Sequence, residues 1–359
     1  MTLKTNITEM FGIKHPIASA AMGPFRTTEL AIAVSEAGGL GMISHAHQSM
    51  DGREATAIVA MKKNLDYVVE HTDGIFGFNI RTSRLTVDCD KFISETAKHI
   101  MGNPKLREQC LYALTSAGSA SRMPQNKDFQ KLRENTQIKH FHVAPALWLA
   151  DKCVSAGCDG LVVTGFEGGG HQAYEKVGGL VLLQQVQQKH PDIPKIACGG
   201  FATGAGMAAA LALGAGGIAM GSRFIASHDS EFHEKYKNVV PTAKAQDTII
   251  RTGTLGSIRL WKNKYSLSKG LVRNREEKMA EEKATQEHRA AITKEKIAEE
   301  LRKEAYAAFA VFEGDMENGA VLLGQSIGVI SQLESVSDII ETTIKDAEKA
   351  LRKAITFVD

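Results

Sequence analysis

The sequence lacks any apolar run long enough to span a membrane, and its first residues, Met1–Thr8, have no hydrophobic signal region. It also lacks an excess of one charge, because 43 Lys and Arg residues nearly balance 41 Asp and Glu residues. The five cysteines form an odd set without the spacing of a metal site. We therefore expect a cytoplasmic globular protein with reduced thiols and no metal, which binds neither nucleic acid nor membrane.

The chain instead contains short apolar runs that alternate with helix-like segments as far as about residue 225. Eight runs are interpreted as strands, and this alternation is typical of a closed parallel barrel or a doubly wound sheet. The count of eight favours a (β/α)8 barrel, also called a TIM barrel. The expected strands are Pro16–Ala20, Gly41–Ser44, Ile75–Asn79, Leu111–Thr115, His140–Ala144, Gly160–Thr164, Lys195–Cys198 and Gly217–Met220.

One stretch, Gly157–His171, combines such a strand with a loop that contains four glycines among seven residues and ends in His171. Glycines let backbone N–H groups approach a bound group closely, and a histidine exchanges protons near neutral pH. The alternative is a glycine-rich turn with an incidental histidine. The segment Ser119–Lys127, farther upstream, is interpreted as a loop.

Residues that follow the strands should form the active face, because a barrel places its chemistry at the carboxyl ends of its strands. The loops after the last two barrel strands, Cys198–Gly204 and Met220–Phe224, are rich in glycine, and Ser222 adds a hydroxyl. Such loops suit a phosphate, and no Gly-x-Gly-x-x-Gly unit is apparent for a dinucleotide. A cofactor with one phosphate is expected, and FMN is the leading candidate. Glycines that serve only the turns are the alternative.

Composition changes after Arg251, and Ser266–Ala307 is dense in Lys, Arg and Glu. We interpret Ser266–Ala307 as long helix with charge pairs four residues apart, such as Lys283 with Glu287. A solvated cover or lid over the substrate is the leading interpretation, and a coil that binds a partner is the alternative. A closing amphipathic helix is predicted at Ser337–Thr356. The domains are then 1–225, a barrel, 226–311, a charged helical domain, and 312–359, a segment that returns to the barrel.

These motifs together resemble the nitronate monooxygenase family, also called 2-nitropropane dioxygenases, which includes the flavin-dependent type II enoyl-acyl carrier protein reductases. The resemblance covers nearly the whole chain. Its motifs are Thr8-Glu-Met-Phe-Gly-Ile-Lys-His-Pro16, Glu36-Ala-Gly-Gly-Leu-Gly-Met-Ile43, Phe76-Gly-Phe-Asn79, Glu167-Gly-Gly-Gly-His171, Cys198-Gly-Gly200, Met220-Gly-Ser-Arg-Phe224, Gly314-Asp315 and Gly324-Gln325-Ser-Ile-Gly328.

The resemblance implies an FMN-binding barrel with a smaller, mainly helical second domain. His171 is the candidate catalytic residue because of its position, since the three glycines before it leave no side chain between its ring and the flavin. The candidate flavin contacts are Ala21, Met22, Gly23, Asn79, Thr115, Thr164, Gly169, Gly170, Gly199, Gly200, Met220, Gly221, Ser222 and Gln325. Ser19 and Thr164 occupy positions near which family members often carry Gln, and these departures bear on the substrate more than on the flavin.

Three functions follow. The first is oxidation of a nitronate or similar carbanion with oxygen at FMN, with His171 as base or hydrogen-bond donor. The second is NADH- or NADPH-dependent reduction of an enoyl thioester, linked to acyl carrier protein or CoA, or of a quinone. The third is a flavin-free scaffold for a protein partner. A homodimer is also open.

Overall fold

Eight parallel strands form the core of the computed structural model, which describes residues 3–48, 56–83, 88–253, 256–268, 275–293, 310–358 and isolated residues between 295 and 307. In space the strands follow the order β1-β9-β8-β6-β5-β4-β3-β2, and a bridge between Ala18 and Leu40 brings β1 to β2. The ring is therefore closed, as the predicted (β/α)8 barrel requires. The strands are β1 (Ile17–Ser19), β2 (Gly41–Ile43), β3 (Phe76–Arg81), β4 (Cys110–Ser116), β5 (Lys139–Ala144), β6 (Gly160–Thr164), β8 (Lys195–Cys198) and β9 (Gly217–Met220).

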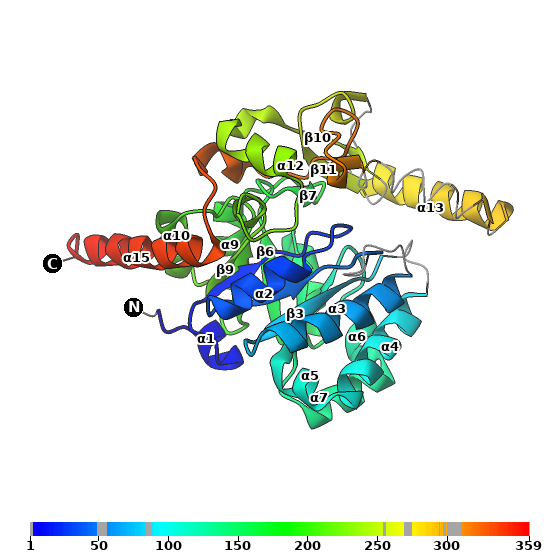
Figure 1. Ribbon diagram of the computed structural model, residues 1–359, viewed down its shortest axis with the longest axis horizontal. Helices are drawn as coiled ribbons and strands as arrows, with labels where there is room; N and C mark the ends of the chain where they lie inside the picture. Colours follow the sequence, from blue (N-terminus) through cyan, green and yellow to red (C-terminus); the bar gives the residue numbers. More distant parts are fainter. Residues whose placement is uncertain are drawn as a thin grey trace.

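Helices cover the outside of this ring (Figure 1). They are α2 (Thr28–Glu36), α3 (Ala57–His71), α4 (Cys89–Gly102), α5 (Pro104–Gln109), α6 (Arg122–Gln125), α7 (Lys127–Asn135), α8 (Leu147–Ser155), α9 (Gly179–Lys189) and α10 (Gly204–Ala212). At the amino ends of the strands, α1 (Asn6–Phe11) inserts Phe11 against Tyr112, with ring centroids 5.4 Å apart. Because α1 closes that end with apolar rings, the opposite end is left for a ligand. The expectation of a loop at Ser119–Lys127 was incomplete, since α6 forms within it.

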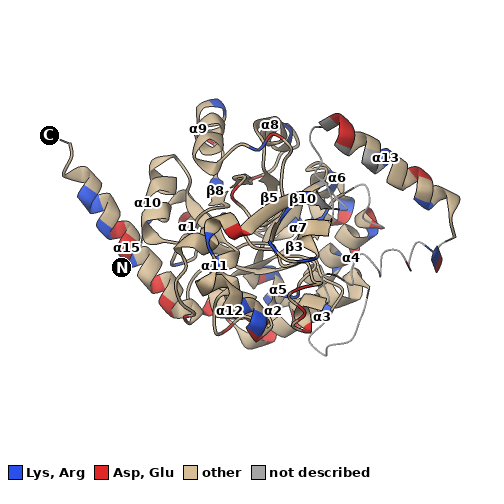
Figure 2. Cartoon of the chain, turned by 90° about the horizontal axis from the view of Figure 1, so that it is seen from above, with Lys and Arg blue, Asp and Glu red and all other residues tan. Residues whose placement is uncertain are grey.

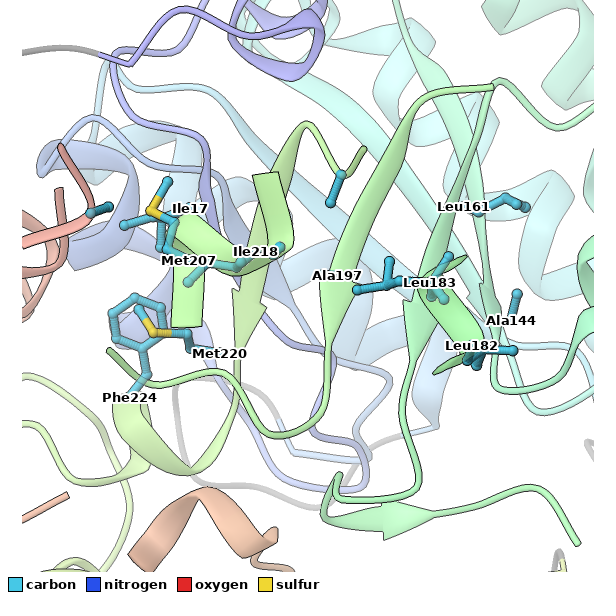
Figure 3. Close-up of a cluster of buried hydrophobic side chains, with 14 of the residues drawn as sticks. Ile17, Ala144, Leu161, Leu182, Leu183, Ala197, Met207, Ile218, Met220 and Phe224 are labelled. Atoms are coloured by element: carbon cyan, nitrogen blue, oxygen red, sulfur yellow. The ribbon is translucent and has the colours of Figure 1, made fainter. Parts of the chain in front are cut away.

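Side chains alternate between the inside and the outside of the barrel, as the two-residue period of a strand dictates. On the outside, strand residues such as Ile17, Leu161 and Ala197 pack against α9 and α10 through Leu182, Leu183 and Met207 (Figure 3). These contacts bury most of the apolar surface of the strands. The alternation decides which residue at each strand end faces the central cavity.

A second layer lies over the carboxyl end of the barrel and contains a three-stranded antiparallel sheet. β10 (Thr248–Gly253) pairs with β11 (Gly256–Trp261), and β11 pairs with β7 (Gly170–His171) from the glycine-rich loop. The expectation of a mainly helical second domain missed this sheet. Its other elements are α11 (Ser222–Ile225), α12 (Glu234–Val239), η1 (Val240–Thr242), η2 (Ala245–Asp247), η3 (Ser266–Ser268) and η4 (Gln325–Val329).

The expected long helix is present in part as α13 (Arg275–Ala291), which projects from the body of the molecule with charges of both signs (Figures 1 and 2). Lys283 and Glu287 form the expected ion pair, 3.7 Å apart. The rest of Ser266–Ala307 falls largely outside the described residues. The closing helix α15 (Val336–Ile355) packs on α10 with Ile340 and Ala347 buried. Among the described residues, no helix is both long and apolar enough to cross a membrane.

Candidate active site

A cavity of about 900 Å³ opens at the carboxyl ends of the barrel strands, beneath the three-stranded sheet. The ends line up because Thr164 is in register with Cys198, and Cys198 with Ala219. Both the size and the position are those of a cofactor or substrate site in a barrel. Twelve of the predicted site residues line this cavity: Ala21, Met22, Gly23, Asn79, Thr164, Gly169, Gly170, His171, Gly199, Gly200, Gly221 and Ser222.

Three other predicted residues, Thr115, Met220 and Gln325, are not brought to the cavity lining. Thr115 points outward, where its hydroxyl contacts the rings of His140 and His142, and Met220 packs in the outer core (Figure 3). Their inward neighbours on the same strands, Leu114, Ser116 and Ala219, line the cavity instead, as strand alternation requires. Gln325 lies between lining residues Gly324 and Ser326 and donates its N–H to the Glu167 carbonyl.

The two glycine-rich loops supply hydrogen-bond donors without partners. Gly199 and Gly200 both have positive φ angles, 80° and 89°, so the backbone turns sharply at the end of β8. Among the described residues, no acceptor contacts the N–H groups of Gly200 and Gly221. The Ser222 hydroxyl, which accepts a hydrogen bond from Gly324 N at 3.0 Å, still has its proton to donate. These groups fit a phosphate, since unpaired backbone donors at strand ends are the usual anion site of such folds.

The loop that carries Met22 and Gly23 is fixed against β2 by hydroxyl groups. Met22 N donates to Ser44 Oγ at 2.8 Å, and Ser44 N donates to Thr27 Oγ1 at 2.9 Å. Met22 and Thr27 come from the loop between β1 and α2, and Ser44 follows β2, so the loop edge that faces the cavity has a defined position. Such fixed backbone suits contact with a flat ring.

The glycine-rich loop from Gly165 to His171 is held at both ends. Glu167 accepts the N–H of Gly179 at the start of α9, at 2.8 and 3.0 Å. A Cβ at Gly169 would lie 2.7 Å from Gly324 N, so only glycine lets the C-terminal segment pass. His171 follows on β7 opposite Ile258 and lines the cavity. The loop is therefore ordered by its backbone and presents one histidine to the site.

Three cations that the sequence interpretation missed also line the cavity: Arg81, Arg122 and Lys152. No carboxylate accompanies them among the described lining residues. Burial lowers the pKa of Arg81 to about 10. Strand alternation could have found Arg81, because it lies two residues beyond Asn79 on β3 and so faces the same way. Arg122 and Lys152 lie on α6 and α8, where no strand pattern applies.

Cys198 lines the same cavity, and the protonation state of its thiol decides whether it can act as a nucleophile. Burial raises the pKa of its thiol to about 11. The thiol is therefore protonated near neutral pH, whereas a nucleophilic cysteine acts as the thiolate. Cys198 is therefore not a nucleophile. Among the predicted site residues, His171 is the candidate for proton transfer, and a bound cofactor would supply any electron transfer.

Comparison with known proteins identifies the family of the chain. The model of the nitronate monooxygenase family matches residues 4–346. The chain is 28% identical over 385 residues to (3aS,4S,5R,7aS)-5-hydroxy-7a-methyl-1-oxo-octahydro-1H-indene-4-carboxyl-CoA dehydrogenase of Mycobacterium tuberculosis, which it covers completely and which covers it completely. It is 28% identical to a probable nitronate monooxygenase of Staphylococcus saprophyticus, over 70% of this chain and 76% of that protein.

Among solved structures, FabK from Thermotoga maritima superposes with a TM-score of 0.76 and 31% identity, over 99% of this chain and 100% of that one. The cavity, its glycine-rich loops and these matches lead to one conclusion: the chain belongs to the nitronate monooxygenase family, whose members are flavin-dependent oxidoreductases.

Proposed function

We propose that this chain binds FMN in the barrel cavity and oxidises a nitronate or a similar carbanion, with oxygen as the final acceptor. One observation carries the proposal: unpaired donors for a phosphate and a histidine line one cavity that contains cations and no described carboxylate. A nitronate is an anion, and such a cavity attracts it.

Gly200, Gly221 and Ser222 would hold the FMN phosphate, and the Met22–Gly23 backbone would lie along the ring. FMN, when bound, supplies the electron chemistry. His171 would hold the nitronate oxygens through a ring N–H or, where the neutral carbon acid binds, take the proton whose loss gives the carbanion. The β7–β11 sheet covers this part of the cavity and excludes water from it.

A second candidate is reduction of an enoyl thioester by NADH or NADPH on the same FMN. Arg122, Lys152 and Trp148 favour it, because they extend the cavity beyond what a small nitronate requires. The full-length match to a CoA-ester dehydrogenase supports a thioester in a related cavity. His171 would then polarise the thioester carbonyl or supply a proton.

Spectra of the purified protein test both functions. Mass spectrometry of the released cofactor should give FMN; FAD or no flavin would contradict the proposal. Under anaerobic conditions a nitronate should bleach the flavin absorbance, and oxygen should restore it. Bleaching by NADH or NADPH alone, with reoxidation by an enoyl thioester, would assign the second function. A homodimer and a cytoplasmic location stay predictions, which sedimentation and cell fractionation would test.

A further inference from the structure

Two of the three cations of the cavity, Arg81 and Arg122, lie across the barrel from the glycine-rich loops that follow β8 and β9. In the order β1-β9-β8-β6-β5-β4-β3-β2, strand β3 lies four places from β8, and β4 four places from β9, in both directions around the ring. Arg81 ends β3, and Arg122 follows β4. The donors expected to hold the FMN phosphate follow β8 and β9 and are all uncharged. These cations therefore serve an anion other than the FMN phosphate.

Arg81 lacks a counter-ion within the described part of the chain. No hydrogen bond or ion pair of its guanidinium to a described residue is present, and burial alone accounts for the lowered pKa. A largely buried cation of this kind is costly unless a bound anion neutralises it. Because the cavity lining includes Arg81, an anionic ligand can reach it.

Cys89 links the Arg122 side chain to the Arg81 backbone, and both arginines line the cavity. The Cys89 thiol donates to the Arg81 carbonyl at 3.8 Å and also interacts with the Arg122 side chain. Hydroxyl groups complete this wall of the cavity, with Ser119 Oγ and Ser121 Oγ 2.9 Å apart. Two guanidinium groups among hydroxyls are the usual recognition set for a phosphate monoester.

An aromatic surface lies on a different wall of the same cavity. The rings of Trp148 on α8 and Tyr174 stack at 18°, with centroids 6.3 Å apart, and Lys152 Nζ lies 4.9 Å from the Trp148 ring. Trp148 is 37% exposed and lines the cavity, so a ligand in the cavity can contact its ring. Flat aromatic faces bind nucleic bases by stacking. A nucleotide carries both a phosphate and a base, so it could contact both walls of the cavity.

We propose that Arg81 and Arg122, with Ser119 and Ser121, form a second phosphate subsite, which binds the ribose-linked phosphate monoester of a nucleotide ligand. Two ligands carry that group: NADPH, on its 2′ oxygen, and a coenzyme A thioester, on its 3′ oxygen. The Trp148–Tyr174 surface would bind part of the adenine. The subsite rests on the proposed flavin site in the same cavity and belongs to the second candidate function, because oxidation of a nitronate by oxygen involves no nucleotide ligand.

Binding to the full-length flavoprotein, measured by isothermal titration calorimetry, tests the subsite without turnover. Two pairs of ligands differ only in the monoester: NADPH with NADH, and coenzyme A with dephospho-coenzyme A. We expect the phosphorylated member of one pair to bind about 10- to 100-fold more tightly, as charge-assisted hydrogen bonds to phosphate provide. Discrimination within the first pair identifies the ligand as a nicotinamide donor, and within the second as a CoA thioester.

Three variants and a control locate the effect. Arg122→Gln should reduce the preference for the phosphorylated ligand to about one, and Arg122→Lys should retain part of it. Lys131→Gln, an exposed change on α7, should leave it unchanged. Equal binding of both members of both pairs by the wild-type protein would overturn the subsite. Loss of bound FMN from Arg81→Gln would also overturn it, because Arg81 would then belong to the flavin site. Absence of FMN from the wild-type protein would instead contradict the proposed function, and flavin content is measured first for that reason.

Discussion

The hydroxyl of Ser222 accepts a hydrogen bond from the N–H of Gly324 at 3.0 Å, although the two residues lie 102 positions apart. This bond ties the C-terminal segment to the loop after β9 and orients the serine oxygen in the cavity. The Gly324 backbone in turn passes against Gly169, so both glycine-rich motifs and the proposed phosphate loop meet at one point. The position of this serine is thus set from two sides.

Ser222→Asp should leave the barrel folded and remove the flavin. A carboxylate at this position would face the phosphate in a partly desolvated site, where like charges repel strongly. Flavin absorbance per protein, together with a far-ultraviolet spectrum, measures the outcome. Ser222→Ala is the matched control and should lose only part of the flavin affinity. Full flavin occupancy in the aspartate variant would show that the phosphate binds elsewhere.

The sequence was sufficient for the barrel because its strands are short apolar runs separated by helices. The prediction of Gly160–Thr164 matches β6, and Lys195–Cys198 matches β8. The three-stranded sheet gave no comparable signal. β7 has only two residues. Its partner β11 contains Arg259, a residue type that predicts an exposed position. Arg259 is instead buried, and its guanidinium donates to the Phe166 carbonyl at 2.9 Å. The pairing of β7 with β11 depends on tertiary contacts, which no local sequence pattern reveals.

The sequence predicted the parts of the site that are formed by backbone groups, and it was less successful for the parts that are formed by side chains. Glycine-rich loops identified Gly200 and Gly221 directly. Thr115 and Met220 lie at predicted strand ends, but a position at a strand end does not specify the face of the barrel, and both residues point outward. Arg122 and Lys152 reach the cavity from helices, so only the fold brings them there.

Met279→Ala should raise the KM for the substrate about three- to tenfold and leave flavin content unchanged. Met279 is the described residue of α13 that lines the cavity, and it is 40% exposed, so its loss removes part of an apolar wall. Lys283→Ala, farther along the same helix, is the control and should match the wild type. If Met279→Ala also lost flavin, α13 would be part of the cofactor site and would not act as a lid.

Acid should destabilise the protein through the histidines beside Thr115. Burial lowers the pKa of His142 to about 4, and burial lowers the pKa of His140 well below its usual range. The unfolded chain, with a histidine pKa of about 6.5, then binds protons more readily than the folded one. The contribution of the neutral histidines to the free energy of unfolding is therefore fully present above about pH 6.5. It falls as the pH drops towards 4, by about 3 kcal/mol for His142.

Melting temperatures measured from pH 7.5 to 4.5 would detect this loss. His142→Gln removes the titrating ring, so its melting temperature should be lower at pH 7.5 and should depend less on pH. His71→Gln, at an exposed position on α3, should retain the wild-type slope. Equal slopes for wild type and His142→Gln would assign the acid sensitivity to other groups.

His171→Asn should lower turnover about 10²- to 10⁴-fold while flavin content and melting temperature stay normal. The backbone hydrogen bonds around His171 explain why turnover should fall while flavin binding and stability stay normal. Next to it, Gln172 N donates to the Ser257 carbonyl at 2.8 Å, and β7 pairs with β11, so the strand is held by groups that the substitution leaves intact. Asparagine is polar and has a similar reach, but it cannot exchange a proton near neutral pH.

Gln172→Ala is the control for loop order, because the Gln172 side chain donates to the Gly168 carbonyl at 2.8 Å. That variant should weaken flavin binding, since it loosens the glycine-rich loop, and should recover turnover when FMN is added in excess. His171→Asn should not recover, because its flavin site is already filled. Rapid-reaction spectra would place its defect in flavin reduction by the substrate. Near-native turnover of His171→Asn, or recovery with added FMN, would show that the histidine only orders the loop.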